Sequence, residues 1–377
     1  MLIQLAIKGM LVALLALAAV WASRDANKYR KLAWVTVFLT FDLIMFGAFT
    51  RLTDSGLGCP DWPGCYGHAN PLQAHESIKA AEAAMPDGPV TVAKAWIEML
   101  HRYFAMGVGV LIIALMAVAW RNWSRARRGN AGSVAARAMS PWLPSFLLLF
   151  VCVQGAFGAW TVTMKLQPVI VTIHLLLGMG LLALLAWLAA RQSVHAPVVP
   201  AARGLRIPAA LALVVLFCQI ALGGWVSTNY AALACTDLPT CHGAWLPEMD
   251  FENGFTLWRH LGRTGDGDFL PFPALTAIHW AHRVFALVVA AILGWVAVRA
   301  MRIDGLRKTG TWLLAALVLQ IVIGISTVYL SWPLALAVAH NGCAALLVLL
   351  LSMLNYKANL AAAPLTASRM TTHIAAA

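Results

Sequence analysis

Charged residues are scarce in this chain. Of its 377 residues, only 11% are Asp, Glu, Lys or Arg, and Asp and Glu together number 15. Hydrophobic residues make up 61%, and the mean hydropathy is +0.76. A soluble domain does not need so much apolar surface, so this composition excludes a soluble globular protein. No G-x-G-x-x-G motif follows a predicted strand either, which removes the usual sequence evidence for a bound dinucleotide or flavin.

In place of charge the chain has a series of long apolar runs. Each is about 20 residues long, which is enough to cross a hydrocarbon core roughly 30 Å thick as a helix. The runs predict an all-α polytopic membrane protein with nine spanning helices. We expect the first helix to be retained, because Lys8 interrupts it and the cleavage-like stretch AVWASRD is weak. The expected bounds are 2–22, 32–50, 95–120, 141–163, 168–190, 207–228, 274–298, 310–331 and 333–356.

The net charge of +12 is explained by the location of the basic residues. If the nine helices alternate in direction, most basic residues fall in loops on one side of the membrane. This asymmetry follows the positive-inside rule, so the charge requires no nucleic acid or other polyanionic partner. It predicts an amino terminus outside and a cytoplasmic carboxyl terminus. The basic residues on the predicted cytoplasmic side are Arg24, Lys28, Arg30, Lys31, Arg121, Arg125, Arg127, Arg128, Arg137, Arg191, Arg203, Arg206, Arg299, Arg302, Arg307, Lys308, Lys357 and Arg369.

Two short cysteine loops repeat one pattern. The spacing C-x-D-x-P-x-C-x-G occurs in residues 59–67 and again in residues 235–243. Both copies lie on the predicted outer side of the membrane, where disulfide bonds form. The bonded pairs that we expect are Cys59–Cys65 and Cys235–Cys241. Three further cysteines within helices, expected to be inert packing residues, are Cys152, Cys218 and Cys343.

Other segments repeat together with these loops. A His-Arg pair follows each loop, QGAFGAWTV corresponds to QIVIGISTV, and a later histidine stands at the same distance from each of these segments. We infer two copies of a four-helix unit, residues 32–190 and 207–356. Because four is even, both copies have the same orientation and are related by a pseudo-two-fold axis along the membrane normal. The remaining parts are an extra N-terminal helix and loop, 1–31, and a cytoplasmic tail, 357–377.

Four histidines occupy matching positions in the two units: His101, His174, His282 and His340. Each is expected about seven to nine residues inside the outer end of its helix, or ~10–13 Å below the outer interface. Any one of them alone could be a hydrogen-bonded packing residue. Two imidazoles facing each other across a bundle, however, are the axial ligands of a six-coordinate haem, so we predict one haem per unit. A zinc site would need four converging ligands, and the absence of C-x-x-C-H excludes covalent c-type haem.

The residues beside the histidines differ between the units. Arg102 and Arg283 each follow a predicted ligand, and we expect them to pair with haem propionates; the alternative is that they snorkel to the interface. One turn before the ligand, the first unit has Glu98 and the second has His279. A carboxylate within the membrane is a functional candidate, so Glu98 is the predicted catalytic residue. Its alternative roles are an ion pair with Arg102 or a cap near the helix start.

Taken together, these motifs resemble those of the haem A synthase family. The resemblance is carried by the segment GAFTRLTDSGLGCPDWPGCYG, the E-x-x-H-R helix, the later H-R helix and the two lone histidines, and it spans nearly all of residues 32–356. Members of the family oxidise a methyl group of haem O to a formyl group, giving haem A for cytochrome oxidase. The cysteine pairs match the branch of the family that carries such clips. The helix at 2–22 and the long loop at 229–273 lie outside this pattern.

The resemblance implies a substrate site for haem O between His101 and His174, with Glu98 needed for the chemistry. It implies haem b between His282 and His340, relaying electrons. We hypothesise that the methyl group is oxidised twice to a geminal diol, which loses water to give the formyl group. The implied partners are the haem O synthase (a farnesyltransferase), the assembling cytochrome oxidase and the surrounding lipid bilayer, and the implied location is the bacterial inner membrane.

Three other functions remain open at this point. A dihaem b-type cytochrome that only carries electrons explains the histidines but leaves the difference between Glu98 and His279 unused. A membrane thiol–disulfide oxidoreductase explains the cysteine pairs but not the histidines. A transporter explains the repeat but should show helices broken by Gly or Pro near the midplane, and those signals are weak. Whether the cysteine pairs are structural or redox-active also stays open.

Overall fold

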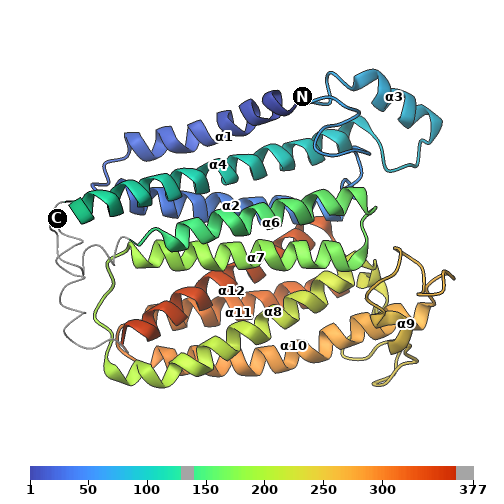
Figure 1. Cartoon of the computed structure of the whole chain (residues 1–377). Helices are drawn as coiled ribbons and strands as arrows, with labels where there is room; N and C mark the ends of the chain where they lie inside the picture. Colours follow the sequence, from blue (N-terminus) through green and yellow to red (C-terminus); the bar gives the residue numbers. More distant parts are fainter. Residues whose placement is uncertain (129–139, 362–377) are drawn as a thin grey trace.

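The computed structural model describes residues 1–128 and 140–361, and within these ranges the chain is helical and has no strand. Nine of the described helices are long and apolar enough to cross a membrane, which confirms the predicted fold class (Figure 1). Arg137, Arg369 and most of the tail 357–377 lie outside the described residues. The nine helices are α1 Leu2–Ala22, α2 Lys28–Leu52, α4 Val92–Arg128, α6 Trp142–Thr163, α7 Pro168–Arg191, α8 Arg206–Thr228, α10 Phe272–Met301, α11 Arg307–Tyr329 and α12 Leu334–Leu360.

Several helices extend beyond the apolar runs that predicted them. Helix α2 begins at Lys28 because Asn27 caps it: the Asn27 side chain accepts a hydrogen bond from the Arg30 N–H at 2.9 Å. Helix α4 continues through charged residues to Arg128. Hydropathy locates the part of a helix within the hydrocarbon core, whereas the helix itself ends where its backbone hydrogen bonds stop.

The helices of each predicted unit contact one another in a closed ring. In the first unit α2 packs on α4, α4 on α6, α6 on α7, and α7 on α2. In the second unit α8 packs on α10, α10 on α11, α11 on α12, and α12 on α8. These are the neighbour contacts that two tandem four-helix bundles would make.

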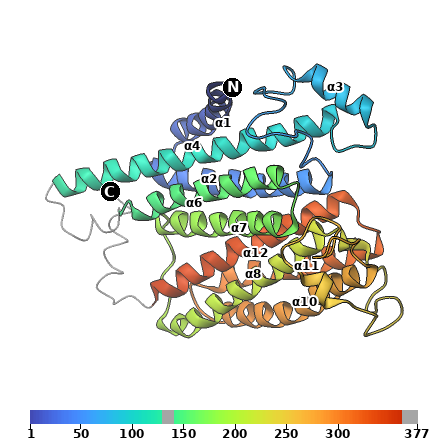
Figure 2. The same cartoon turned by 45° about the vertical axis from the view of Figure 1, so that its right-hand side comes forward.

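The two rings meet through matching helices, and Figure 2 shows one ring stacked on the other. The contacts between them join α2 to α12, α7 to α8, and α7 to α12. Helix α2 corresponds to α8 in the repeat, and α7 corresponds to α12. The contact of α2 with α12 is therefore equivalent to that of α8 with α7, and the contact of α7 with α12 joins a helix to its own counterpart. A two-fold relation between the units would produce this pattern.

Irregular backbone conformations repeat as well. Non-glycine residues with positive φ are uncommon in proteins. In the described residues they occur as four pairs at corresponding positions, two at helix-to-helix turns and two in the outer loops. The pairs are Asp54 and Tyr230, Tyr66 and His242, Lys165 and Ser331, and Leu166 and Trp332. The loops of the two units therefore follow the same backbone course, as the sequence repeat indicates.

The extra helix α1 packs along α4 of the first unit. Lys8, on α1, donates a hydrogen bond to the carbonyl oxygen of Ala69 at 2.9 Å, and its ammonium lies 4.9 Å from the centroid of the Tyr103 ring. The Tyr103 hydroxyl donates to the same carbonyl at 2.7 Å. Helix α1 and α4 thus hold the first outer loop from two sides.

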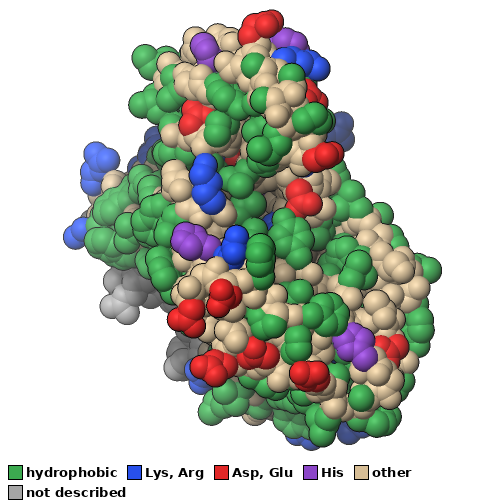
Figure 3. All heavy atoms as spheres, turned by 90° about the vertical axis from the view of Figure 1, so that its right-hand side faces the viewer, with side chains coloured by type: hydrophobic (Ala, Val, Ile, Leu, Met, Phe, Trp, Pro, Cys, Tyr) green, Lys and Arg blue, Asp and Glu red, His purple; other side chains and the backbone are tan. Residues whose placement is uncertain are grey.

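The loops at one end of the molecule contain three short elements, α3 His75–Ala84, η2 Ala231–Leu233 and α9 Phe251–Phe255. A fourth, η1 Pro200–Leu205, lies at the opposite end. The amino terminus lies at the same end as α3 and α9 (Figure 1). Figure 3 shows this end, where acidic side chains and a few basic ones are scattered among hydrophobic and uncharged residues.

The long loop after α8, for which no sequence pattern was apparent, folds back on the end of that helix. The Trp225 indole N–H donates to the Gly254 carbonyl at 2.8 Å. Arg259 is only 3% exposed and donates to Asn229 Oδ1 at 2.7 Å and to the Arg263 carbonyl at 3.1 Å. Burial lowers the pKa of Arg259. These contacts anchor the loop over the second unit.

The cysteines outside the loops do not all behave as packing residues. Cys343 is buried, with its sulfur 3.2 Å from the Ala316 carbonyl. Cys152 and Cys218 are exposed on the surfaces of α6 and α8, so the prediction of interior packing is wrong for these two. An apolar helix gives no amphipathic pattern from which its buried face could be read.

Candidate functional site

The four predicted ligand histidines lie on spanning helices near the loop-rich end. His174 and His340 each stand six residues after the first residue of their helices, α7 and α12. His101 and His282 stand nine and ten residues after the starts of α4 and α10. His101 and His174 lie on α4 and α7 of the first ring of helices, and His282 and His340 lie on α10 and α12 of the second. Each predicted pair thus belongs to one ring of helices, as the repeat predicts.

Each of these imidazoles packs against a glycine on a neighbouring helix of its own unit. A Cβ atom added to any of the four glycines would come within 3.1 Å of the imidazole Cε1, closer than ordinary van der Waals contact. We call these four glycines the glycine seats, because each lets an imidazole lie directly against the helix backbone. The seats are Gly47 for His101, Gly158 for His174, Gly223 for His282 and Gly324 for His340.

The imidazole nitrogens have few protein partners. The Gln219 amide nitrogen lies 3.1 Å from Nδ1 of His282, and that of Gln320 lies 3.1 Å from Nε2 of His340. A buried polar atom without a partner is costly, so these rings lack the contacts that histidines placed only for packing would make. The paired donor set therefore fits one bis-histidine haem in each unit. Among the described residues, Nδ1 is buried and makes no hydrogen bond in His101, His174 and His340.

Both cysteine pairs are disulfide-bonded, as predicted. Cys59 is bonded to Cys65 and Cys235 to Cys241, with 4.9 Å between the Cα atoms in each pair. None of the four residues is more than 2% exposed. Thiol–disulfide exchange requires an accessible sulfur. This burial favours the structural role of the pairs over the redox role that the sequence left open.

An aspartate closes each cysteine loop. Its carboxylate accepts hydrogen bonds from the backbone N–H groups of the two residues that follow the second cysteine, at 2.6–3.0 Å. In the second loop, Asp237 also accepts from the Thr240 hydroxyl at 2.6 Å. This hydrogen bond and those from the backbone hold the pKa of Asp237 well below its usual range. Asp237 is therefore a carboxylate at neutral pH and stabilises the loop as one.

The arginine beside each ligand contacts the cysteine loop above it. In the first unit, Arg102 Nη1 donates to the Gly64 carbonyl at 2.6 Å. In the second unit, Arg283 donates to the Asp237 carbonyl at 2.7 Å and to the Cys235 carbonyl at 2.6 Å. The two arginines thus tie each loop to the helix that carries a ligand histidine. Their pairing with propionates stays a prediction.

Glu98 is buried between the first cysteine loop and Arg102. Its side chain is 5% exposed, and Oε1 lies 2.5 Å from Arg102 Nη2. Its other oxygen, Oε2, accepts a hydrogen bond from the Cys59 N–H at 2.8 Å. The ion pair that the sequence offered as the alternative role is thus present. It fixes the carboxylate one helical turn from His101.

His279 makes the corresponding contacts in the second unit. Its Nδ1 lies 3.3 Å from the backbone nitrogen of Cys235, and its Nε2 lies 3.2 Å from Nε of Arg283. A neutral imidazole accepts a hydrogen bond at one of these two nitrogens. Glu98 and His279 therefore occupy equivalent places, each linking a cysteine loop to an arginine. What differs is the charge: the first unit holds a carboxyl group where the second holds an imidazole.

Sequence reasoning missed several residues of this site. Gly158 and Gly324 were noticed only as markers of the repeat, and Gly47 and Gly223 were not noticed. A glycine at the same distance before the outer end of α2 and α8 was a signal that could have found them. Tyr103 was missed because its contact with the loop depends on the loop's course in space.

Comparison with known proteins places the chain in a recognised group. The COX15-CtaA family model, described as cytochrome oxidase assembly protein, matches residues 30–352. The chain is 40% identical over 333 residues to the protein named heme A synthase of Shewanella oneidensis, covering 86% of this chain and 96% of that protein. It is 29% identical over 354 residues to the heme A synthase of Bradyrhizobium diazoefficiens, covering 85% and 90% of the two chains.

Proposed function

Since the chain belongs to the COX15-CtaA family of cytochrome oxidase assembly proteins, we propose that it acts as a haem A synthase. One observation carries the proposal beyond the likeness of sequence. Each of two repeated units pairs two membrane histidines, each seated on a glycine and three of them with a buried ring nitrogen that has no partner among the described residues. This donor set suits two bis-histidine haems.

The two units have different tasks in this proposal. The first binds haem O as substrate between His101 and His174, and the second binds haem b between His282 and His340. Bound haem b supplies one-electron redox chemistry. Arg102 and Arg283 are proposed to pair with the propionates, because a guanidinium binds a carboxylate in bidentate fashion.

The proposed reaction converts a methyl group of haem O into the formyl group of haem A, a four-electron oxidation. Positive charge or an acidic proton develops at the methyl carbon as electrons leave it. At this position the first unit has Glu98, which can carry a negative charge. The corresponding residue of the second unit is His279, which cannot. Because Arg102 and the Cys59 N–H hold the carboxyl group in place, it is positioned to stabilise that charge or to accept a proton.

The nine apolar helices and the family indicate an integral membrane protein. We propose that it lies in the bacterial inner membrane with the cysteine loops outside, because most of the basic residues lie at the opposite end. The disulfide bonds agree with an oxidising compartment on the loop side. The proposed partners are the haem O synthase that supplies the substrate and the cytochrome oxidase that receives the product.

The test is to produce the full chain in cells that also make haem O, then to extract and chromatograph the pigments. Haem A that appears only when the chain is present is the expected result. Haem B alone, with a bis-histidine spectrum, would make the protein a dihaem electron carrier. Purified protein without any haem would contradict both the synthase and the electron-carrier function. A thiol–disulfide function of the cysteine pairs would then be the one to test.

A further inference from the structure

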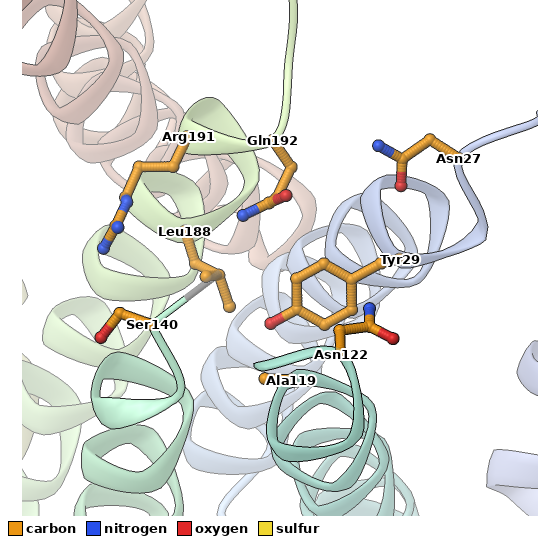
Figure 4. A pocket seen from close by; sticks show the side chains of 8 residues that line it. All are labelled: Asn27, Tyr29, Ala119, Asn122, Ser140, Leu188, Arg191 and Gln192. Atoms are coloured by element: carbon orange, nitrogen blue, oxygen red, sulfur yellow. The ribbon is translucent and has the colours of Figure 1, made fainter. Parts of the chain in front are cut away.

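A polar cavity lies at the end of the first unit opposite the histidine pairs. It has a volume of about 90 Å³, whereas one buried water needs on the order of 10–15 Å³. Figure 4 shows it between the amino-terminal end of α2, the late part of α4 and the carboxyl-terminal end of α7. Its lining residues are Asn27, Tyr29, Ala119, Asn122, Ser140, Leu188, Arg191 and Gln192.

The lining is rich in hydrogen-bond donors and carries a positive charge. Arg191 forms no ion pair or side-chain hydrogen bond with any other residue that the structure describes, and none of the lining residues is acidic. The side chains of Tyr29, Asn122 and Gln192 likewise have no hydrogen-bond partner within residues 1–128 and 140–361. In Figure 4 the Arg191 guanidinium extends along one side of the cavity and the Tyr29 ring and Asn122 lie on the other side. One cation and several unpartnered donors lining a single cavity suit an anion.

Aromatic residues place this cavity at the level of the lipid headgroups. Trp120, Trp123 and Trp142 form a cluster on the adjoining parts of α4 and α6, with ring centroids 5.2 and 5.7 Å apart. Trp142 is 66% exposed. Tryptophan gathers at the boundary between hydrocarbon and water, so the cavity opens near the headgroups of the predicted cytoplasmic leaflet.

The second unit has no such cavity lining at the corresponding positions. Leu205 stands where the first unit has Tyr29, and Ile303 where it has Asn122. Lys357 corresponds to Arg191, but its ammonium donates to the Thr309 hydroxyl at 2.8 Å. The combination of an unpartnered cation and unpartnered donors in one cavity is therefore a feature of the first unit and not a general property of the repeat.

We propose that this cavity binds a phosphate group, with Arg191 as its cation and Tyr29, Asn122 and Gln192 as hydrogen-bond donors. A basic pocket between spanning helices near the cytoplasmic surface is a recurrent binding site for anionic phospholipid headgroups. The same chemistry would also accept free inorganic phosphate. The site is separate from the histidine pairs, so it does not depend on the proposed function.

The test is native mass spectrometry of the full chain in detergent, titrated separately with phosphatidylglycerol, phosphatidylcholine and inorganic phosphate. We expect one phosphatidylglycerol to bind saturably, with an affinity about tenfold lower in Arg191→Gln. Phosphatidylcholine should bind more weakly. The matched control is Lys357→Gln, which removes one cation at the corresponding place in the second unit and should retain the binding.

The arms of the titration separate the two phosphate sources. Saturable phosphate binding that Arg191→Gln removes, without preference for phosphatidylglycerol, would support a free phosphate site. Tyr29→Phe keeps the ring and removes only the hydroxyl, so it should weaken binding even if Arg191→Gln misfolds. Equal binding of all ligands to the wild type, Tyr29→Phe and Arg191→Gln would overturn the proposal.

Discussion

The two units of this protein use one geometry with different chemistry. In the first, Glu98 accepts a hydrogen bond from the Cys59 N–H and pairs with Arg102. In the second, the His279 ring lies between the Cys235 N–H, 3.3 Å from Nδ1, and Arg283, 3.2 Å from Nε2. The shared contacts show that the position has a structural role in both units. The difference in charge is the reason that we propose a second, chemical role for Glu98 in the first unit.

The units also differ in what holds the cysteine loop closed. Lys8 of α1 and Tyr103 of α4 both donate to the Ala69 carbonyl in the first loop. The second unit has no counterpart of α1 and has Val284 at the position of Tyr103. The carbonyl that corresponds to that of Ala69 belongs to Trp245, and it accepts a hydrogen bond from the Trp280 indole N–H at 3.1 Å. Two helices therefore donate to this carbonyl in the loop above the proposed substrate site, and one helix does so in the loop above the proposed haem b site.

The largest expected effect is from Glu98→Gln. This substitution keeps the shape and one hydrogen-bond acceptor but removes the negative charge, so haem A formation should fall by about 10²–10⁴-fold. Haem content should stay near that of the wild type. The measurement is chromatography of extracted pigments together with the haem-to-protein ratio. The matched control is His279→Gln, and an equal loss of product in both variants would show that the position serves only to hold the loop.

The next largest effect is expected when a ligand histidine is removed from one unit at a time. His282→Ala should remove the haem of the second unit, and His101→Ala should prevent the first unit from holding substrate, because each unit would lose one of the two histidines proposed to hold its haem. Haem quantification and the optical spectrum of the purified protein give the readout. Loss of all haem from either variant would contradict two separate sites.

Much of this arrangement could be predicted from the sequence, and the part that could not has a physical reason. Hydropathy alone locates nine helices, and the repeated motifs pair His101 with His174 and His282 with His340. Contacts such as that between Glu98 and the Cys59 N–H depend on how a loop folds back on a helix, which no local pattern encodes. Helices that are apolar on every side also conceal which face turns inward.

The glycine seats are among the features that the sequence does not predict, because identifying them requires knowing the rotation of each helix about its axis. Gly47→Ala and Gly223→Ala each place a Cβ 3.0–3.1 Å from the imidazole of the ligand on the adjacent helix. The ring must shift, at a cost of about 1–3 kcal/mol by analogy with overpacked cores. We expect weaker haem retention, by about tenfold, and a changed low-spin electron paramagnetic resonance signal.

The change should be confined to the haem of the unit that carries the substitution, so the other unit serves as an internal reference. Gly155→Ala and Gly109→Ala are the controls, since an added Cβ at either position meets nothing within 4 Å. These controls lie on α6 and α4, the same helices that carry Gly158 and His101. Spectra that change equally in a seat variant and its control would refute the role of the seats.

The smallest expected effect tests the extra anchors of the first loop. Tyr103→Phe removes the hydroxyl that donates to Ala69 and keeps the ring that Lys8 contacts. One hydrogen bond contributes about 1 kcal/mol, so amides of residues 59–69 should exchange with solvent about fivefold faster. Residues 235–245 serve as the internal reference because Val284 stands at the position of Tyr103 and their corresponding carbonyl accepts from Trp280 instead.

The matched substitution for Tyr103→Phe is Tyr329→Phe in the second unit. The Tyr329 hydroxyl is exposed and reaches the Leu238 carbonyl at 3.4 Å, too far for a strong hydrogen bond. Its removal should leave exchange in the second loop unchanged. If hydrogen exchange quickens in the first loop only, α1 and α4 restrain the entrance to one unit, and the two units differ in access as well as in charge. If hydrogen exchange changes equally in both loops, the hydrogen bonds to the Ala69 carbonyl do not stabilise the first loop in particular. The charge of Glu98 would then be the difference that distinguishes the units.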